Sequence, residues 1–113
     1  MNKLTLILLP LLLICALALS ACGSTNALAG TSWTLVSYGD PANLTAAVSG
    51  VDTTLDFAQD GTLGGSMGCN SFGGDYKVKG SQIVFGNLFS TEMACDEPRM
   101  NQETATFAVM SGT

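Results

Sequence analysis

Glycines that separate short apolar runs are the feature that most restricts how this 113-residue chain can fold. The sequence contains 13 glycines, and only 12% of its residues are charged. Glycine takes the positive φ angles of tight turns without steric cost, and it weakens helices when it lies inside them. The composition therefore predicts β structure with many turns and argues against a helical bundle.

Alternating apolar and polar side chains predict several short strands between these turns. We expect strands at Ser32–Tyr38, Val51–Phe57 and Thr62–Met67, around Tyr76 and Val78, around Ile83 and Phe85, and near Leu88 and Phe89. In the first strand, Trp33 and Leu35 should lie on the buried side. Strands at such short, regular spacing predict an antiparallel meander that closes in part into a barrel-like sheet.

The C-terminal part of the sequence changes to a helical period. Met100, Phe107 and Met110 recur near helical spacing, Pro98 suits a first helical turn, and Gly112 suits the end of a helix. These features predict one amphipathic helix from about Glu97 to Met110 that packs on the sheet. The predicted fold class is therefore mainly β (α+β), with one C-terminal packing helix.

The N-terminus has the features of a secretory signal. Lys3 supplies a cationic start, and Leu4–Leu19 is an apolar run of 16 residues, shorter than the roughly 20 that cross a bilayer as a helix. The following Leu19–Cys22 resembles the lipobox of bacterial lipoproteins. We therefore expect residues 1–21 to be a signal peptide, Cys22 to carry the lipid and residues 22–29 to form a flexible tether.

Cleavage before Cys22 would leave 92 residues, enough for one small domain. Loss of Lys3 leaves three basic and nine acidic residues, a formal net charge of −6. A surface with this net charge should repel nucleic acid and anionic lipid headgroups, so nucleic acid is not an expected partner. Membrane lipid is a partner through acylated Cys22. Because Gly23 follows the cysteine and not the Asp that retains lipoproteins at the inner membrane, we expect the periplasmic face of the outer membrane in a Gram-negative cell. In other cells we expect the outer face of the cytoplasmic membrane.

Four cysteines are present, and Cys69 and Cys95 remain as a pair after Cys15 leaves with the signal and Cys22 is lipidated. A disulfide between them would close a loop of about 27 residues and stabilise the domain by about 3 to 4 kcal/mol. Two other interpretations compete with the bridge. One is a pair of free buried thiols, and the other is a redox or Cu(I) site with Met67 and Met93.

The sequence argues against an enzyme. It has no histidine, which removes the common nucleophile and base arrangements, and we expect no cofactor and no metal. The glycine-rich segment 64–74 is predicted as a wide turn or bulge in which Asn70 bonds backbone groups. The alternative is a binding surface with Asn70, Phe72 and Tyr76 as exposed contacts.

Several motifs together resemble the META domain, the HslJ-like family of bacterial envelope proteins. They are Gly30–Trp33, Leu55–Phe57 with Gly61, Gly68–Tyr76, and Thr91–Cys95 with Pro98, Met100, Glu103 and Phe107. The resemblance covers nearly all of residues 30–113 and implies a small, mostly β protein with a helix. It also implies a link to heat-shock response and novobiocin resistance. Family members continue after the helix into a final pair of strands. Compared with that family pattern, residues 30–113 lack the final pair.

Two function classes follow from these observations. The first is a non-catalytic, lipid-anchored envelope module that binds an unknown envelope protein or small ligand during stress or antibiotic challenge. The second is a small barrel-like carrier of an apolar ligand. A cavity inside the sheet would separate them, and we expect none, with the interior filled by Trp33, Leu55, Phe57, Ile83 and Phe85.

Overall fold

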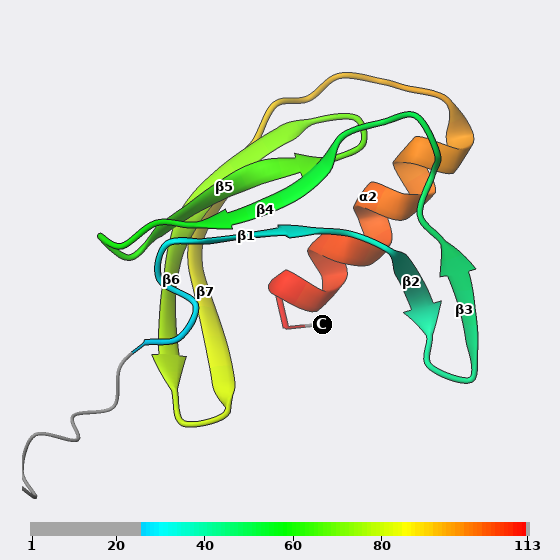
Figure 1. Ribbon diagram of the computed structural model, residues 1–113. Coiled ribbons are helices and arrows are strands. Elements are labelled where there is room, and N and C mark those ends of the chain that lie inside the picture. Colours follow the sequence, from blue (N-terminus) through cyan, green and yellow to red (C-terminus); the bar gives the residue numbers. More distant parts are fainter. Residues whose placement is uncertain (1–25, 113) are drawn as a thin grey trace, which may run out of the picture.

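The computed structural model describes residues 26–112, which form seven strands and one helix (Figure 1). The elements are β1 (Thr31–Thr34), β2 (Ser37–Asp40), β3 (Asn43–Ala46), β4 (Thr53–Phe57), β5 (Thr62–Met67), β6 (Ser71–Lys79), β7 (Gln82–Ser90) and α2 (Glu97–Met110). Five strands form an antiparallel sheet in the order β1-β4-β5-β6-β7, and β2 and β3 form a separate hairpin. The mainly β fold with a C-terminal helix is confirmed, and the sheet remains open between β1 and β7.

The hairpin of β4 and β5 follows the sequence prediction closely. β5 has the predicted bounds, and β4 starts two residues later than the predicted Val51 and buries Thr53 and Phe57 on one face. In the connecting turn, Asp60 Oδ1 accepts hydrogen bonds from the backbone N–H and the hydroxyl of Thr62, at 3.0 and 2.7 Å. These bonds lower the pKa of the Asp60 carboxyl, since they favour its charged form.

The first predicted strand, Ser32–Tyr38, is wrong as a single element. Leu35 donates its N–H to Thr53 O of the main sheet at 3.0 Å, whereas Val36 O accepts from Ala47 N at 2.9 Å. The chain therefore changes hydrogen-bonding partner between these two residues, so that β1 stays in the sheet and β2 leaves it to pair with β3. A residue alternation alone does not show which strand is the partner, and β3 itself was not predicted.

The predicted fifth and sixth strands are one continuous strand, β7. Gly86 and Asn87 look like a turn in the sequence, but Asn87, at φ 49°, lies within the strand, where pairing with β6 shifts register between Gly73 and Asp75. The irregularity is a bulge and not a chain reversal. The glycine-rich segment 64–74, predicted as a wide turn or bulge, lies mostly within β5 and β6. Its glycine at position 65 allows close approach of β4, since a Cβ on Gly65 would lie 1.9 Å from Thr54 O.

Helix α2 has the predicted bounds and packs against β5 and β2. Its Met110 is buried together with five side chains of the sheet, which are Phe57, Leu63, Met67, Phe72 and Tyr76. Edge-to-face ring contacts join Phe57 to Tyr76 and Phe72 to Phe107, at centroid distances of 4.8 and 5.6 Å. The helix residues Phe107 and Met110 therefore pack into the core.

The N-terminal boundary of the folded part lies before Gly30. Leu28 packs against the core, and Asn26 Nδ2 donates to Tyr76 Oη at 3.4 Å, so part of the predicted tether contacts the domain. The predicted signal peptide and Cys22 lie outside the described residues. Across residues 26–112, no helix combines the length and apolar character that crossing a bilayer requires.

Candidate functional site

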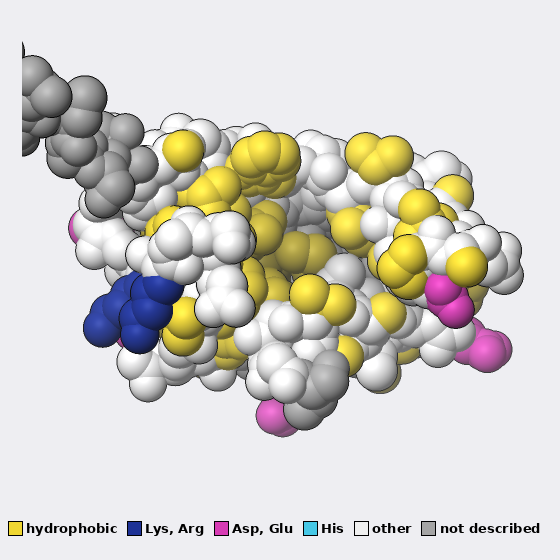
Figure 2. Space-filling view, turned by 90° about the horizontal axis from the view of Figure 1, so that it is seen from below, with side chains coloured by type: hydrophobic (Ala, Val, Ile, Leu, Met, Phe, Trp, Pro, Cys, Tyr) yellow, Lys and Arg dark blue, Asp and Glu magenta, His cyan; other side chains and the backbone are white. Residues whose placement is uncertain are grey.

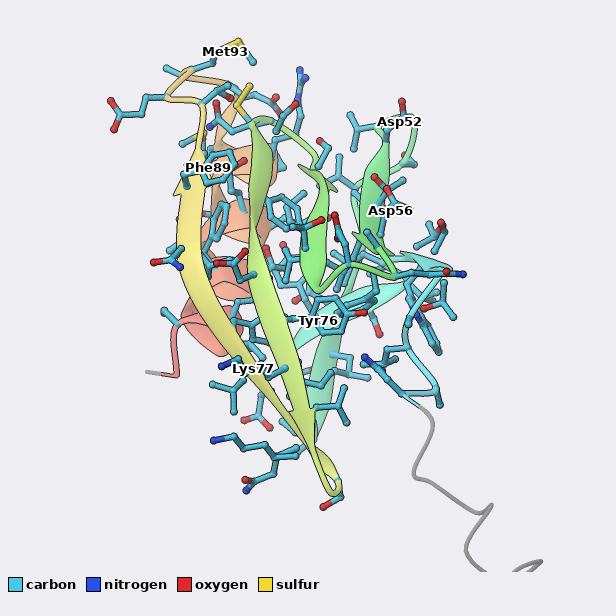
Figure 3. The ribbon with its side chains drawn as sticks, turned by 90° about the vertical axis from the view of Figure 1, so that its left-hand side faces the viewer. Asp52, Asp56, Tyr76, Lys77, Phe89 and Met93 are labelled. Carbon is cyan, nitrogen blue, oxygen red and sulfur yellow. A yellow bond between two sulfur atoms is a disulfide. The ribbon has the colours of Figure 1, made fainter. Side chains whose placement is uncertain are left out.

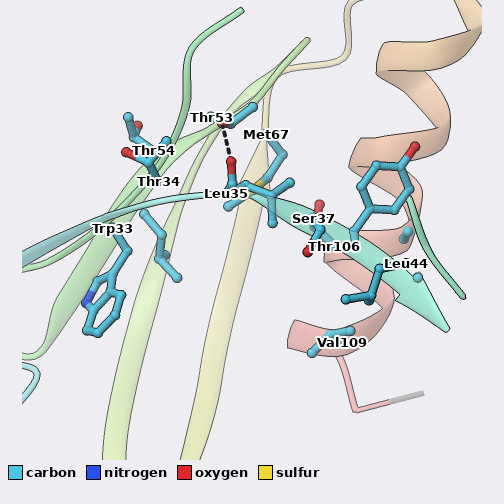
Figure 4. Close-up of a pocket in the computed structure, with 14 residues that line it drawn as sticks. Trp33, Thr34, Leu35, Ser37, Leu44, Thr53, Thr54, Met67, Thr106 and Val109 are labelled. Atoms are coloured by element: carbon cyan, nitrogen blue, oxygen red, sulfur yellow. Dashed lines mark hydrogen bonds between the residues drawn. The ribbon is translucent and has the colours of Figure 1, made fainter. Parts of the chain in front are cut away.

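A hollow of about 360 Å³ opens between the end of the main sheet, the β2–β3 hairpin and α2. Figure 2 shows hydrophobic side chains around a depression in this face of the molecule. We call it the β1 groove. Its lining consists mainly of apolar side chains, and it comprises Trp33, Thr34, Leu35, Ser37, Tyr38, Gly39, Leu44, Thr53, Thr54, Leu55, Met67, Ala105, Thr106 and Val109 (Figure 4).

The groove overturns the expectation of a fully filled interior. Phe57 is buried, and Leu55 and Phe85 are half-buried against the core, but Ile83 and Trp33 are exposed. Trp33 pairs with Leu55 across β1 and β4 and so lies on the predicted side of the sheet. It is nevertheless 55% exposed, because α2 packs on β5 and β2 and does not cover β1. The sequence indicated the correct face but not what covers it.

One edge of β1 is unpaired beside this groove. The register with β4 and the bond from Leu35 N to Thr53 O place the odd-numbered backbone groups of the strand toward β4. The N–H and C=O groups of Ser32 and Thr34 therefore point away from the sheet. Among the described strands, none pairs with β1 on that side.

Two buried polar residues of α2 fix the helix that forms one wall of the groove. Gln102 is fully buried, where Nε2 donates to Met67 O at 2.7 Å and Oε1 accepts from Val48 N at 2.8 Å. Glu103 accepts the backbone N–H and the side-chain Nδ2 of Asn70, each at 2.7 Å. These bonds connect the helix to the end of β5, to the turn before β6 and to the segment before β4. Neither role was predicted from the sequence, although Glu103 lies on the same helix face as Met100 and Phe107.

Asn70 is the centre of this polar cluster. Its Oδ1 accepts from Met93 N at 2.7 Å and from Thr91 Oγ1 at 2.8 Å, and Nδ2 also donates to Met93 O at 3.2 Å. The prediction that Asn70 bonds backbone groups is confirmed. The alternative of a binding surface is wrong, because Asn70, Phe72 and Tyr76 are at most 5% exposed.

The Cys69–Cys95 disulfide is present and ties the same turn to the segment that leads into α2. Its presence favours the structural interpretation of the cysteines over free thiols. Met67 is buried in the core and Met93 is exposed on the loop (Figure 3), so the two methionines do not form a common site with the sulfurs. Within residues 26–112, no group of three or more His, Cys, Asp or Glu side chains is placed to hold a metal ion.

Comparison with known proteins agrees with this architecture. The family model of the META domain matches residues 26–113, and the chain belongs to this family. A protein from Burkholderia xenovorans with an NMR structure is 30% identical and superposes with a TM-score of 0.65, over 74% of this chain. The present chain spans 62% of that protein's length. Among curated proteins, none matches this sequence.

Proposed function

We propose that this protein is a non-catalytic, lipid-anchored module of the cell envelope that binds an extended apolar peptide segment in the β1 groove. The observation that carries the proposal is the unpaired edge of β1 at the side of an apolar hollow. The resemblance to HslJ-like proteins supports a role during envelope stress or antibiotic challenge. The partner is then an envelope protein that exposes such a segment.

An extended peptide suits both parts of the groove. Its main chain can exchange hydrogen bonds with Ser32 and Thr34, the two residues whose backbone groups point away from β4. Because side chains alternate along a strand, every second side chain of the peptide would enter the hollow between Trp33, Leu44 and Val109. This is the mode in which a peptide adds a strand to an exposed sheet edge, with affinity from the main chain and specificity from the pockets.

A second candidate is a carrier of a small apolar molecule, and the size of the hollow favours it. Ligand sites commonly have volumes of roughly 300 to 1,000 Å³ and mostly apolar walls, and 360 Å³ falls at the lower end of this range. A small apolar molecule would fill the hollow without pairing with β1. The two candidates therefore differ in whether binding requires backbone hydrogen bonds.

A fluorescence titration tests the proposed function. Trp33 is the only tryptophan and it lines the groove, so its emission reports occupancy directly. The probe is a soluble peptide of alternating valine and threonine with a lysine at each end. Its control is the same peptide with N-methyl groups on the backbone nitrogens of one edge. We expect a blue shift with the first peptide and none with the second, and equal shifts would favour the small-molecule carrier.

A matched pair of variants locates the binding. Val109→Glu places a carboxylate on the groove wall, and Val36→Glu places one outside the groove. The two valine side chains are similarly exposed, Val109 by 77% and Val36 by 79%. Binding would have to desolvate the carboxylate only in the first variant, so we expect the peptide Kd to rise about tenfold there and to stay unchanged in the second. Equal Kd values for both variants would contradict binding in the groove.

The lipid anchor is tested separately. We expect radiolabelled palmitate to enter the wild-type protein and not Cys22→Ser, because the acyl chains would attach only at the lipobox cysteine. The measurement is the label in the immunoprecipitated protein after growth with labelled fatty acid. Equal labelling of the two proteins would rule out Cys22 as the lipid site.

A further inference from the structure

Positive charge gathers at the tip of the β6–β7 hairpin. Between Asp75 and Glu92, Lys77 and Lys79 are the only charged side chains in the sequence. Both are exposed, and neither forms an ion pair within residues 26–112, whereas the remaining base of the domain, Arg99, pairs with Asp96. Asp75, the nearest acid along the strand, accepts a hydrogen bond from Asn87 Nδ2 at 2.7 Å.

Apolar side chains accompany the lysines at this tip. Val78 and Ile83 face each other across the hairpin on the side that carries Tyr76, and Val84 pairs with Lys77 on the other side. All three apolar side chains are exposed, because the core ends at Tyr76 and Phe85. Exposed apolar residues next to lysines are the combination that binds the interface of an anionic membrane.

The start of the described chain lies at the same end of the molecule as this tip (Figures 1 and 3). Asn26 hydrogen bonds to Tyr76, from which β6 runs on for three residues to Lys79, a distance of about 10 Å. Cys22 precedes Asn26 by four residues, which span at most about 14 Å. A lipid on Cys22 would therefore hold the membrane surface within reach of the hairpin tip.

We propose that the β6–β7 tip docks on anionic phospholipid headgroups and so fixes the orientation of the lipid-anchored domain. This inference rests on the proposed lipid anchor at Cys22. Lys77 and Lys79 would contact the headgroups, and Val78, Ile83 and Val84 would enter the interface. The loop with Met93 and the N-terminus of α2, at the opposite end of the molecule in Figure 3, would then face away from the membrane.

The experiment uses the full acylated chain reconstituted into vesicles, with a spin label on Ser81→Cys in the hairpin turn or on Glu92→Cys at the opposite end. Vesicles of phosphatidylcholine alone are compared with vesicles that contain phosphatidylglycerol. We expect the Ser81 label to contact the bilayer in the anionic vesicles and the Glu92 label to remain in water. Each lysine near an anionic surface raises the ratio of docked to undocked protein about fivefold. The double variant Lys77→Gln with Lys79→Gln should therefore lower this ratio about thirtyfold.

Arg99→Gln is the control for position, because it removes one positive charge from the opposite end of the domain and should leave the Ser81 label unchanged. The anchor has its own readout, which is flotation of the protein with neutral vesicles. Flotation on both vesicle types with a Ser81 label that stays in water would overturn the docking proposal and leave the anchor in place. Failure to float on either type would overturn both.

Discussion

Asn70→Ala is expected to lower the free energy of unfolding by about 3 kcal/mol or more. The substitution removes the donor and the acceptor that connect Glu103, Thr91 and Met93, and it leaves the Glu103 carboxylate buried with one hydrogen bond in place of two. An unsatisfied buried polar group costs about 1 to 3 kcal/mol, and more when it is charged. Denaturant unfolding of the oxidised protein measures the change.

Asn101→Ala is the matched control for this prediction. Asn101 lies on α2 beside Gln102, but its side chain is exposed. We expect its free energy of unfolding to differ from the parent protein by less than about 0.5 kcal/mol. Similar small changes in both variants would show that the polar cluster does not hold the helix against the sheet.

Removal of the Cys69–Cys95 disulfide has the second large expected effect. The bridge joins residues 26 positions apart, and closing a loop of this length restricts the unfolded chain by about 3 to 4 kcal/mol in the chain-entropy model. Cys69→Ser with Cys95→Ser should therefore shift the unfolding midpoint strongly toward lower denaturant. The cost is a large fraction of the stability of a domain of this size.

Reduction of the wild-type protein should reproduce the effect of the double variant, and a reducing agent should have no effect on the variant itself. This comparison separates loss of the bridge from the effect of the serine side chains. If the double variant unfolds at the same denaturant concentration as the oxidised parent, the bridge does not contribute to stability. The structural interpretation of the two cysteines would then lose its energetic basis.

The sequence predicted best what depends on local pattern. Alternation over Thr62–Met67 and the helical period with Pro98 near the start of Glu97–Met110 are carried by neighbouring residues, and both elements have the predicted bounds. The disulfide followed from counting the cysteines available to it. The continuity of β7 was missed, because Gly86 and Asn87 interrupt the alternation and an asparagine with positive φ suits a bulge or a turn.

The candidate site was harder to predict, because it depends on which elements cover each other. Trp33 alternates as a buried residue should, but whether it is buried depends on the position of α2, which crosses β5 and β2 instead. The change of partner between Leu35 and Val36 likewise depends on contacts with residues that are distant in sequence. The role of Gln102 could have been suspected from a long amide side chain next to a helix's apolar stripe, but its partners Met67 and Val48 could not.

Hydrogen exchange at two amides tests the central claim, that the edge of β1 pairs with an extended peptide. Ser32 and Thr34 direct their N–H groups away from the sheet, whereas Leu35 N already bonds to Thr53 O and serves as the internal reference. With the alternating peptide bound, we expect exchange at Ser32 and Thr34 to slow by about tenfold or more, while exchange at Leu35 changes little. Unchanged exchange at Ser32 and Thr34, together with a shift in Trp33 emission, would contradict strand addition and leave only an apolar pocket.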